Sequence, residues 1–483
     1  MGLNSLMEKC KNYINGQWIE SSTGEVIKVN DPATGKIIGE VSCAKEEEVN
    51  MAVEAALNAH NSRVLVDMPP MERAQIMRTI ANELRNVANT GGELLCRENG
   101  KPLPNAIFEF MDAANYFDYY SGLTDKLEGN TIPVNKTVID YTLLEPYGVS
   151  AHIVPWNFPM SMLARSLACA FAAGNATVIK TAELTPLSTA SHFAQAISNA
   201  NVPNGLINVI CGYGNEAGSI LTAHKDVSQI TFTGSVLTGK KILHAAADRA
   251  IPAVVELGGK SAAVVFPDAD LDKVVSAAKG GIFGQAGQIC SAMSRVVVHK
   301  SVKDELVEKL ANMAKGLKVG AGYEDGVELT PLISEQQLQK VENFARSGLQ
   351  AGATTVAGGK RIDRDGYFFE ATVFDNVKPD MTIAQDEIFG PVLSVLTYED
   401  EAEAVHIAND TAYGLAAGVF TKDIDQATNT VNQLQAGQVY VNSWFTGSIA
   451  TPFGGYKQSG YSREKGQEAI KGYLQVKNVG IQL

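Results

Sequence analysis

The chain has 483 residues, a length that at about 150 residues per domain favours two or three domains. Hydrophobic residues make up 45% of the chain and charged residues 19%, a globular balance that argues against a disordered or fibrous protein. The net charge of −13 argues against a broad basic surface for nucleic acid or an anionic membrane.

The cysteines are few and scattered. No two of them form a CxxC pair, which disfavours a disulfide framework and a zinc site, so we expect no metal and a reducing, cytoplasmic environment. The six stand at positions 10, 43, 96, 169, 211 and 290. No apolar run reaches about 18 residues, and the N-terminus MGLNSLMEKC lacks an apolar signal core, so no membrane association is expected.

Helices are predicted early in the chain, where apolar residues recur at helical spacing. They cover residues 44–62, 71–98 and 103–121. The segment 129–145 is rich in Thr, Val, Ile and Tyr and alternates in VIDYTLL, which predicts a strand or hairpin arm.

From residue 147 short apolar strands alternate with helices, which predicts a mostly parallel sheet covered on both faces, with ligands at the carboxyl ends of its strands. Thr185 is a candidate N-cap, with Pro186 in the first turn after it. The strands of this series are GVSAHIV, ATVIK, INVI, QITFT, AVVEL and AAVVF, and the helices cover 161–174, 185–198, 214–223 and 236–248.

After about residue 256 strands and helices continue to alternate, but the turns that separate them differ, which indicates a second α/β unit. The final stretch YLQVKNVGIQ is strand-like and has no later partner, so we expect it to pair at an edge, with another subunit as one candidate. The helices of this part cover 270–283, 303–317 and 334–350, and its strands are SRVVVHK, ATVFDNV, PVLSVLTY, AAGVFT and QVYVN.

Two glycine-bearing turns follow predicted strands, but neither has the GxGxxG spacing of a dinucleotide site. Gly212, Gly214 and Gly218 span one residue too many, and the other turn carries Gly234 and Gly239. Such glycines let a pyrophosphate approach a helix N-terminus. Each turn alone is also consistent with a flexible connection between strand and helix.

Three polar residues stand where chemistry is possible. Asn157, in PWNFP after a strand, could donate to an oxyanion, although PWNFP also fits a rigid turn. Cys290 follows a glycine-rich stretch that favours an accessible thiol, whereas a lone cysteine is more often a buried apolar residue. Glu256 ends an apolar strand, where burial would raise its pKa and suit it as a base; otherwise it is an exposed strand-end acid.

Taken together, these motifs occur in the order and spacing of one family, and the sequence resembles the NAD(P)-dependent aldehyde dehydrogenase superfamily of the hydrolytic, non-CoA-acylating type. KTAE departs from the family's KPSE at its two middle positions. The matching segments are PWNFP at 155–159, KTAE at 180–183, FTGS at 232–235, ELGGKS at 256–261, GQIC at 287–290, EIFGPV at 387–392, NDTAYGLAAGVFT at 409–421 and PFGGYKQSG at 452–460.

The resemblance implies an α/β fold with two Rossmann-like parallel-sheet domains and a small β oligomerisation arm. Residues 1–125 and 147–256 would form the NAD-binding domain and 257–458 the catalytic domain. Residues 126–146 and 459–483 would form the oligomerisation arm and tail of a homodimer or homotetramer.

By the same resemblance Cys290 is the nucleophile that attacks an aldehyde, Asn157 holds the oxyanion, and Glu256 activates the water that cleaves the thioester. A CoA-acylating relative would not need Glu256, and a cysteine hydrolase would need a histidine, which none of the matched motifs contains. A non-catalytic relative would lack one of the three residues.

NAD is the implied cofactor, preferred over NADP because Glu183 would accept from a ribose 2′-hydroxyl and repel a 2′-phosphate. Glu387 would hold the nicotinamide ribose, and Phe389 would pack near the ring, or else only in the core. The full set of implied cofactor contacts is Ile153, Val154, Pro155, Trp156, Asn157, Lys180, Glu183, Gly212, Phe232, Gly234, Ser235, Leu257, Gly258, Glu387 and Phe389.

The implied aldehyde tunnel has an apolar or aromatic wall, which favours a broad range of aliphatic or aromatic aldehydes. Arg165 leaves an alternative open, because some relatives that oxidise carboxylated semialdehydes such as succinic semialdehyde carry arginine there; it could equally form an internal ion pair. The tunnel residues are Met162, Arg165, Ile289, Ser291, Trp444 and Phe453.

Overall fold

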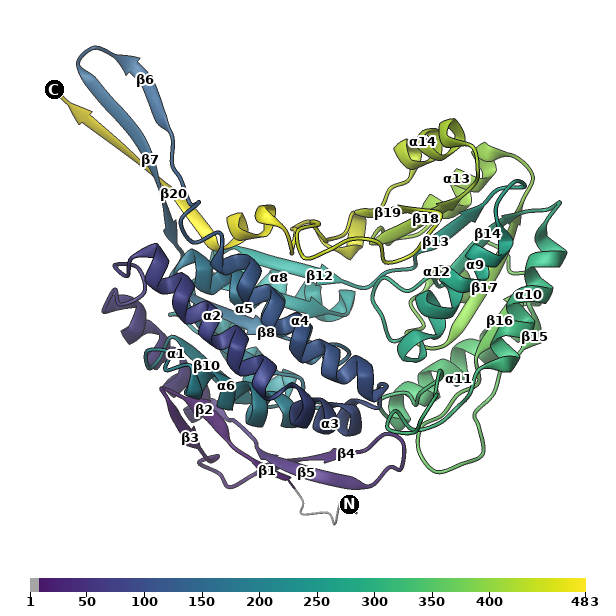
Figure 1. The fold of residues 1–483 in the computed structure, drawn as a ribbon, viewed down its shortest axis with the longest axis horizontal. Coiled ribbons are helices and arrows are strands. Elements are labelled where there is room, and N and C mark those ends of the chain that lie inside the picture. Colours follow the sequence, from purple (N-terminus) through teal and green to yellow (C-terminus); the bar gives the residue numbers. More distant parts are fainter. Residues whose placement is uncertain (1–7) are drawn as a thin grey trace.

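The computed structural model describes residues 8–483; the first seven residues of the MGLNSLMEKC terminus lie outside the described part of the chain. Two seven-stranded sheets, each mostly parallel, carry the structure, and a thin antiparallel arm projects from it (Figure 1). The predicted α/β class with parallel sheets is confirmed.

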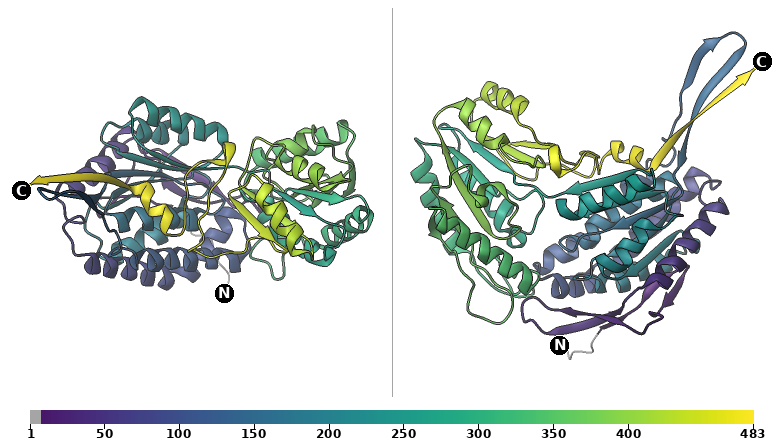
Figure 2. Two further views of the ribbon diagram at one scale, coloured as in Figure 1. Left: turned by 90° about the horizontal axis from the view of Figure 1, so that it is seen from above. Right: turned by 180° about the vertical axis from the view of Figure 1, so that it is seen from behind.

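The first sheet has five parallel strands in the order β12-β11-β8-β9-β10, and β2 and β3 continue it with antiparallel pairing. Helices lie on both of its faces (Figure 2). Because both faces are covered, its central strands are buried along nearly their whole length rather than at alternate residues. The strands are β2 (Asn12–Ile14), β3 (Gln17–Ile19), β8 (Val149–Ile153), β9 (Ala176–Thr181), β10 (Ile207–Cys211), β11 (Gln229–Gly234) and β12 (Ala253–Leu257).

Ten helical segments belong to this half of the chain. They are α1 (Glu46–Asn61), α2 (Pro70–Asn86), α3 (Ala88–Asn99), α4 (Leu103–Ser121), α5 (Pro159–Ala173), η1 (Thr189–Phe193), α6 (Ala194–Asn199), η2 (Gly214–Gly218), α7 (Ser219–Ala223) and α8 (Val236–Asp248).

The second sheet has the order β15-β16-β17-β14-β13-β18-β19, and only β15 runs antiparallel to its neighbour. Its strands are β13 (Ala262–Val265), β14 (Arg295–His299), β15 (Thr354–Ala357), β16 (Thr372–Asp375), β17 (Val392–Tyr398), β18 (Ala416–Phe420) and β19 (Gln438–Val441). Its helices are α9 (Leu271–Ala278), η3 (Lys279–Phe283), η4 (Gly284–Gly287), α10 (Lys303–Gly316), α11 (Glu335–Gln350), α12 (Thr382–Gln385), α13 (Glu401–Asn409) and α14 (Ile424–Gln433).

Two small sheets complete the fold. One has the order β1-β5-β4, and the other is the arm, β20-β7-β6, in which β20 pairs with β7 along nine residues. Their strands are β1 (Glu8–Cys10), β4 (Val26–Asn30), β5 (Ile37–Ser42), β6 (Thr131–Asn135), β7 (Val138–Pro146) and β20 (Leu474–Gln482), and η5 (Lys457–Ser459) and η6 (Gln467–Tyr473) precede β20.

The structure differs from the expected elements at two places. The helix expected over 71–98 is two helices, because Val87 leaves helical geometry at φ −93° and ψ 1°. AAVVF does not close the first sheet: it is β13, between β14 and β18 of the second. The final strand pairs at an edge as expected: β20 is an edge strand of the arm and pairs with β7.

The predicted N-cap at Thr185 is wrong. Its hydroxyl donates instead to the Trp156 carbonyl at 3.3 Å. The first N–H groups of the following helix, on Leu187 and Ser188, donate at 2.7 and 3.0 Å to the buried carboxylate of Glu98, which also accepts from the Ser188 hydroxyl. A cap supplied from α3 therefore replaces the local one.

We expect Glu98→Ala to lower the free energy of unfolding by about 1–3 kcal/mol, because two buried N–H groups would lose their acceptor. Urea denaturation followed by circular dichroism measures the change. Glu93→Ala is the matched control, since Glu93 is an exposed glutamate on the same helix. Equal midpoints for both variants would contradict the capping role.

Candidate active site

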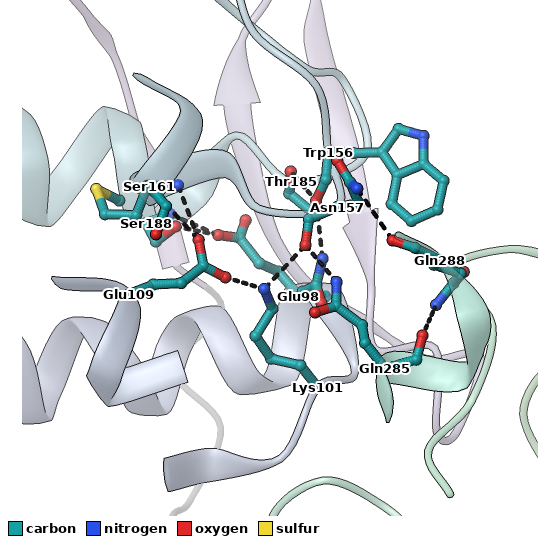
Figure 3. Close-up of polar contacts among 12 residues, drawn as sticks. Glu98, Lys101, Glu109, Trp156, Asn157, Ser161, Thr185, Ser188, Gln285 and Gln288 are labelled. Atoms are coloured by element: carbon teal, nitrogen blue, oxygen red, sulfur yellow. Dashed lines mark hydrogen bonds and ion pairs between the residues drawn. The ribbon is translucent and has the colours of Figure 1, made fainter. Parts of the chain in front are cut away.

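The segment PWNFP follows β8 and is fixed by its own carbonyl groups. The Trp156 carbonyl accepts from the Asn99 amide at 2.8 Å and from the Thr185 hydroxyl. The Asn157 carbonyl accepts from Lys101 Nζ at 2.9 Å and from the Gln285 amide (Figure 3). With both carbonyls held, the Asn157 side chain has a defined direction.

That direction is toward the loop of Cys290. The Asn157 Nδ2 group donates to the Gln288 carbonyl at 3.0 Å, two residues before the cysteine (Figure 3). The Gln288 amide in turn donates to the Gln285 carbonyl at 3.1 Å and accepts from the Ile333 N–H at 2.9 Å. The oxyanion donor and the nucleophile predicted from sequence thus belong to one hydrogen-bonded unit.

A buried ion pair supports this unit from behind. Lys101 and Glu109 are in contact, with side chains 0% and 3% exposed, and Lys101 Nζ also lies 4.4 Å from the centre of the Phe158 ring. Glu109 accepts from the Met160 and Ser161 N–H groups at 3.2 and 3.3 Å, where α5 begins. Neither residue was foreseen, because no spacing in the sequence relates Lys101 to Asn157.

The backbone before Cys290 is strained. Gln285, Ala286 and Gly287 have φ values of 49°, 51° and 71°, in the left-handed region that non-glycine residues rarely adopt. A Cβ atom at Gly287 would collide with the Gly390 carbonyl of the EIFG segment. Strain of this kind persists where surrounding structure enforces it, commonly at functional sites.

Cys290 differs from the other cysteines of the chain, all of which are buried, in being partly accessible. Burial nevertheless raises the pKa of its thiol well above the usual value, and the nearby Glu256 carboxylate raises it further. The thiol is therefore neutral at rest and needs a base to become a nucleophile.

Glu256 lies at the end of β12 and is 2% exposed. Burial raises its pKa to about 8, and the neighbouring Arg165 opposes that rise. Its backbone forms an antiparallel bridge to Gly460, the last residue of PFGGYKQSG, so that motif positions the carboxylate. A carboxyl with a pKa near neutrality can take up and release protons in the working pH range.

Glu387 and Phe389 lie at the opposite wall. The Glu387 carboxylate accepts from the Gly259 N–H at 3.2 Å, and it packs so closely on Gly258 that no Cβ atom would fit there. Burial raises the pKa of Glu387 to about 7. Phe389 has a φ of 58°, its ring meets Trp156 edge-on at 5.4 Å, and its carbonyl accepts from Gln337 at 2.8 Å.

A cavity of about 180 Å³ unites these groups. Eleven of the sequence-predicted residues line it: Pro155, Trp156, Asn157, Met162, Gly234, Ser235, Glu256, Gly258, Cys290, Glu387 and Phe389. Four residues that sequence reasoning missed also line it: Phe158, Thr233, Gln337 and Lys340. Gln337 and Lys340 come from α11, whose amphipathic pattern carries no sign of a ligand.

The remaining predicted cofactor residues lie outside this cavity. Lys180, at the end of β9, pairs with Glu183 at 2.9 Å, and the Lys180 carbonyl accepts from the Val154 N–H at 3.2 Å. Gly212 abuts Ala217 and the Ala44 carbonyl. The other three, Ile153, Phe232 and Leu257, belong to strands of the first sheet.

Most predicted tunnel residues contact one another rather than this cavity. Arg165 pairs with Glu256 at 3.4 Å and with Glu464, and its guanidinium lies 5.2 Å from the Phe453 ring centre. The Trp444 indole donates to the Ser291 carbonyl at 3.1 Å. Ile289 and Ser291 flank Cys290 in sequence, and of the six only Met162 lines the cavity.

Two other kinds of feature are absent from the described residues. Between residues 8 and 483 no group of histidine, cysteine and acidic side chains is arranged to hold a metal ion. Over the same range no helix is long and apolar enough to cross a membrane.

Comparison with known proteins identifies the family. Residues 18–479 match the aldehyde dehydrogenase family. The chain is 43% identical over 468 residues to a mitochondrial aldehyde dehydrogenase of Arabidopsis thaliana, covering 96% of this chain and 87% of the relative. It is 41% identical to a mitochondrial benzaldehyde dehydrogenase of Antirrhinum majus, over 97% and 88% of the two chains.

The solved structures agree. An NAD⁺ complex of aldehyde dehydrogenase from Bacillus cereus superposes with a TM-score of 0.97 and 39% identity, covering 99% of this chain and 97% of that one. The resemblance predicted from the motifs is thereby confirmed, and the chain belongs to the aldehyde dehydrogenase family of enzymes.

Proposed function

We propose that the protein oxidises an aldehyde to the carboxylic acid with NAD and water, through a covalent intermediate on Cys290. The observation that carries the proposal is that the Cys290 thiol, the Asn157 amide and the Glu256 carboxylate meet in one cavity. These are a nucleophile, an oxyanion donor and a base, the three groups that this reaction needs.

In the first step Glu256 takes the proton of the Cys290 thiol, and the sulfur attacks the aldehyde carbon. The resulting alkoxide would accept hydrogen bonds from the Asn157 amide and the Cys290 N–H. Held by Lys101 and Gln285, Asn157 needs little reorganisation to do so, and this preorganisation is the main source of oxyanion stabilisation.

NAD, when bound, accepts the hydride that leaves the tetrahedral carbon. The residues present fit NAD. Position 258 has no room for a Cβ atom beside Glu387, so the wall there is bare backbone, and Trp156 and Phe389 offer aromatic surface. Lys180 and Glu183 would hold the adenosine ribose, so we propose residues 1–125 and 147–256 as the NAD-binding unit. Glu183, 38% exposed, supports a preference for NAD over NADP.

Hydrolysis completes the cycle. Glu256 first releases the thiol proton to solvent; it then accepts a proton from water, the water oxygen bonds to the acyl carbon, and the carbon–sulfur electron pair returns to Cys290 as the acid leaves. The same carboxylate would thus serve as base twice, which suits a pKa near the working pH.

Cys290→Ala should abolish aldehyde oxidation but leave NAD affinity nearly unchanged, because the thiol supplies chemistry rather than binding. NADH formation measures the first property and titration calorimetry with NAD the second. Cys43→Ala, at a buried cysteine outside the cavity, is the control and should keep its activity. Substantial turnover by Cys290→Ala would contradict the covalent mechanism.

At high pH, with NAD and aldehyde both saturating, Glu256→Gln should allow one round of hydride transfer. The variant should then stall before hydrolysis. The expected trace is about one equivalent of NADH per site followed by a slow steady state. In the wild type the hydrolysis rate should rise with pH through about 8, because only ionised Glu256 accepts the proton. A variant that kept this pH dependence would exclude Glu256 as the base.

We propose neutral aliphatic or aromatic aldehydes as substrates. The guanidinium of Arg165 already contacts two carboxylates, which leaves it poorly placed to bind a third from a substrate. Similarity to a benzaldehyde dehydrogenase points the same way. A semialdehyde-selective enzyme is the alternative, favoured only by the presence of an arginine at this position.

Initial rates with hexanal, benzaldehyde and succinic semialdehyde at saturating NAD decide between these classes. We expect kcat/KM to be higher for the two neutral aldehydes. A value at least tenfold higher for the semialdehyde, about 1.4 kcal/mol, would reverse the assignment.

We also propose a homodimer or homotetramer in the cytoplasm. The arm formed by β6, β7 and β20 projects from the molecule, and apolar side chains along it are exposed to 40% or more (Figure 1). They are Ile132, Val134, Ile139, Leu143, Val476 and Ile481. A second copy of the chain would cover them.

Light scattering should therefore give two or four times 51.5 kDa at micromolar concentration. Val476→Asp should weaken the assembly, because it places a charge in the apolar arm. A wild-type mass of 51.5 kDa would refute the oligomer.

A further inference from the structure

The guanidinium of Arg165 lies between two buried carboxylates. Its Nη2 atom is 3.4 Å from Glu256 Oε2 and in contact with Glu464 Oε2. The three side chains are only 3%, 2% and 4% exposed, so water screens none of them well. The three residues come from α5, from the end of β12 and from the segment before η6.

Glu464 is a fixed partner. Its N–H and carbonyl exchange hydrogen bonds of 2.6 Å with Phe453 in an antiparallel bridge. The Phe453 ring lies 5.2 Å from the guanidinium and covers it. Arg165 is therefore held by a charge on one side and an aromatic ring on another.

The two oxygens of Glu256 have different environments. Oε2 faces Arg165, whereas Oε1 is buried and accepts no hydrogen bond from a nitrogen or oxygen donor among residues 8–483; the carboxylate also interacts with the Cys290 thiol. An anchored oxygen beside a free one is the arrangement that a directed base requires, because the free oxygen can accept a proton while the other fixes the carboxylate plane.

We propose that Arg165 is a positioning residue that clamps Glu256 to Glu464, and that it thereby favours the ionised form of Glu256 and orients the carboxylate for cleavage of the acyl-enzyme. The inference rests on the proposed function, because it concerns hydrolysis, the last of its steps. The reaction there is unchanged: water loses a proton to Glu256 Oε1, its oxygen bonds to the acyl carbon, and the carbon–sulfur bond breaks toward sulfur.

Charge balance gives the clamp its effect. Two neighbouring buried carboxylates cannot both ionise readily without a cation, and an opposite charge at about 4–6 Å lowers a carboxyl pKa by about 1–3 units. Burial raises the pKa of both Glu256 and Glu464, and Arg165 opposes both rises. Without Arg165 one of the two would keep its proton to higher pH.

Other titratable groups also face this cluster. On α4, α5 and η6 burial raises the pKa of three of them, which leaves these neutral: Tyr116, Cys169 and Tyr473. Asp112 and Lys465 also face the cluster, and they carry opposite charges. Cys290 and Glu387 face Glu256 from the catalytic side. Arg165 is thus the cation in direct contact with both carboxylates.

The test follows acyl-enzyme decay in wild type, Arg165→Met, Glu464→Gln and the double variant, with NAD and benzaldehyde, from pH 6 to 10. Intact mass after acid quench reports the acyl-enzyme, and NADH reports the hydride step. Arg165→Met should retain the NADH burst at pH values where Glu256 is ionised, and it should move the hydrolysis midpoint up from about 8 by at least about one pH unit. Glu464→Gln should move it down, and the double variant should lie between them.

Two further variants separate positioning from folding. Arg165→Lys keeps the charge and should restore most of the wild-type midpoint. Arg73→Met removes a buried arginine that binds only the carbonyls of Leu65 and Ala172, so it should lower the melting temperature without moving the midpoint. If Arg165→Met does not fold, the shift in Glu464→Gln still decides.

Midpoints unchanged in both Arg165→Met and Glu464→Gln would overturn the clamp. So would a loss in Arg165→Met confined to succinic semialdehyde, since that result would mark the arginine as a substrate contact. Absence of any acyl-enzyme in the wild type would instead overturn the proposed function itself.

Discussion

Lys101 and Glu109 form an ion pair from which water is excluded, and three separate segments depend on it. The ammonium group holds the Asn157 carbonyl and lies against the Phe158 ring, while the carboxylate caps the first turn of α5. A buried pair of this kind is costly to form and costlier to break, since removing one partner strands the other charge. It ties the helices ahead of the first sheet to Asn157, the proposed oxyanion donor.

The loop that carries Cys290 is fixed from the other sheet by shape rather than charge. The left-handed turn over Gln285, Ala286 and Gly287 brings the backbone against the carbonyl of Gly390, and Phe389 beside it is left-handed too. Because these two left-handed segments are in contact, neither backbone has room to relax to an ordinary conformation. The backbone that carries Cys290 is therefore held by these two segments. The Asn157 side chain contacts it through a hydrogen bond to the Gln288 carbonyl.

Sequence reasoning succeeded where the signal is local. The alternation of apolar strands and helices predicted both sheets, and eleven of the proposed site residues line one cavity. It failed where a partner lies far along the chain. Nothing near Thr185 shows that Glu98 will cap the next helix, and nothing near Arg165 shows that Glu464 will meet it. AAVVF was placed in the wrong sheet because an apolar strand does not encode its neighbours.

The separation between Arg165 and Glu464 in the chain has a consequence for how the enzyme is made. Every strand of the first sheet has been synthesised by Leu257, but the core of that half also includes Ala469, Ile470 and Tyr473, so it stays incomplete for the interval until the last segment is made. During that interval Arg165 and Glu256 would neutralise each other as a simple pair. Glu256, the proposed base, therefore acquires its final electrostatic surroundings only when the late segment folds back against Arg165.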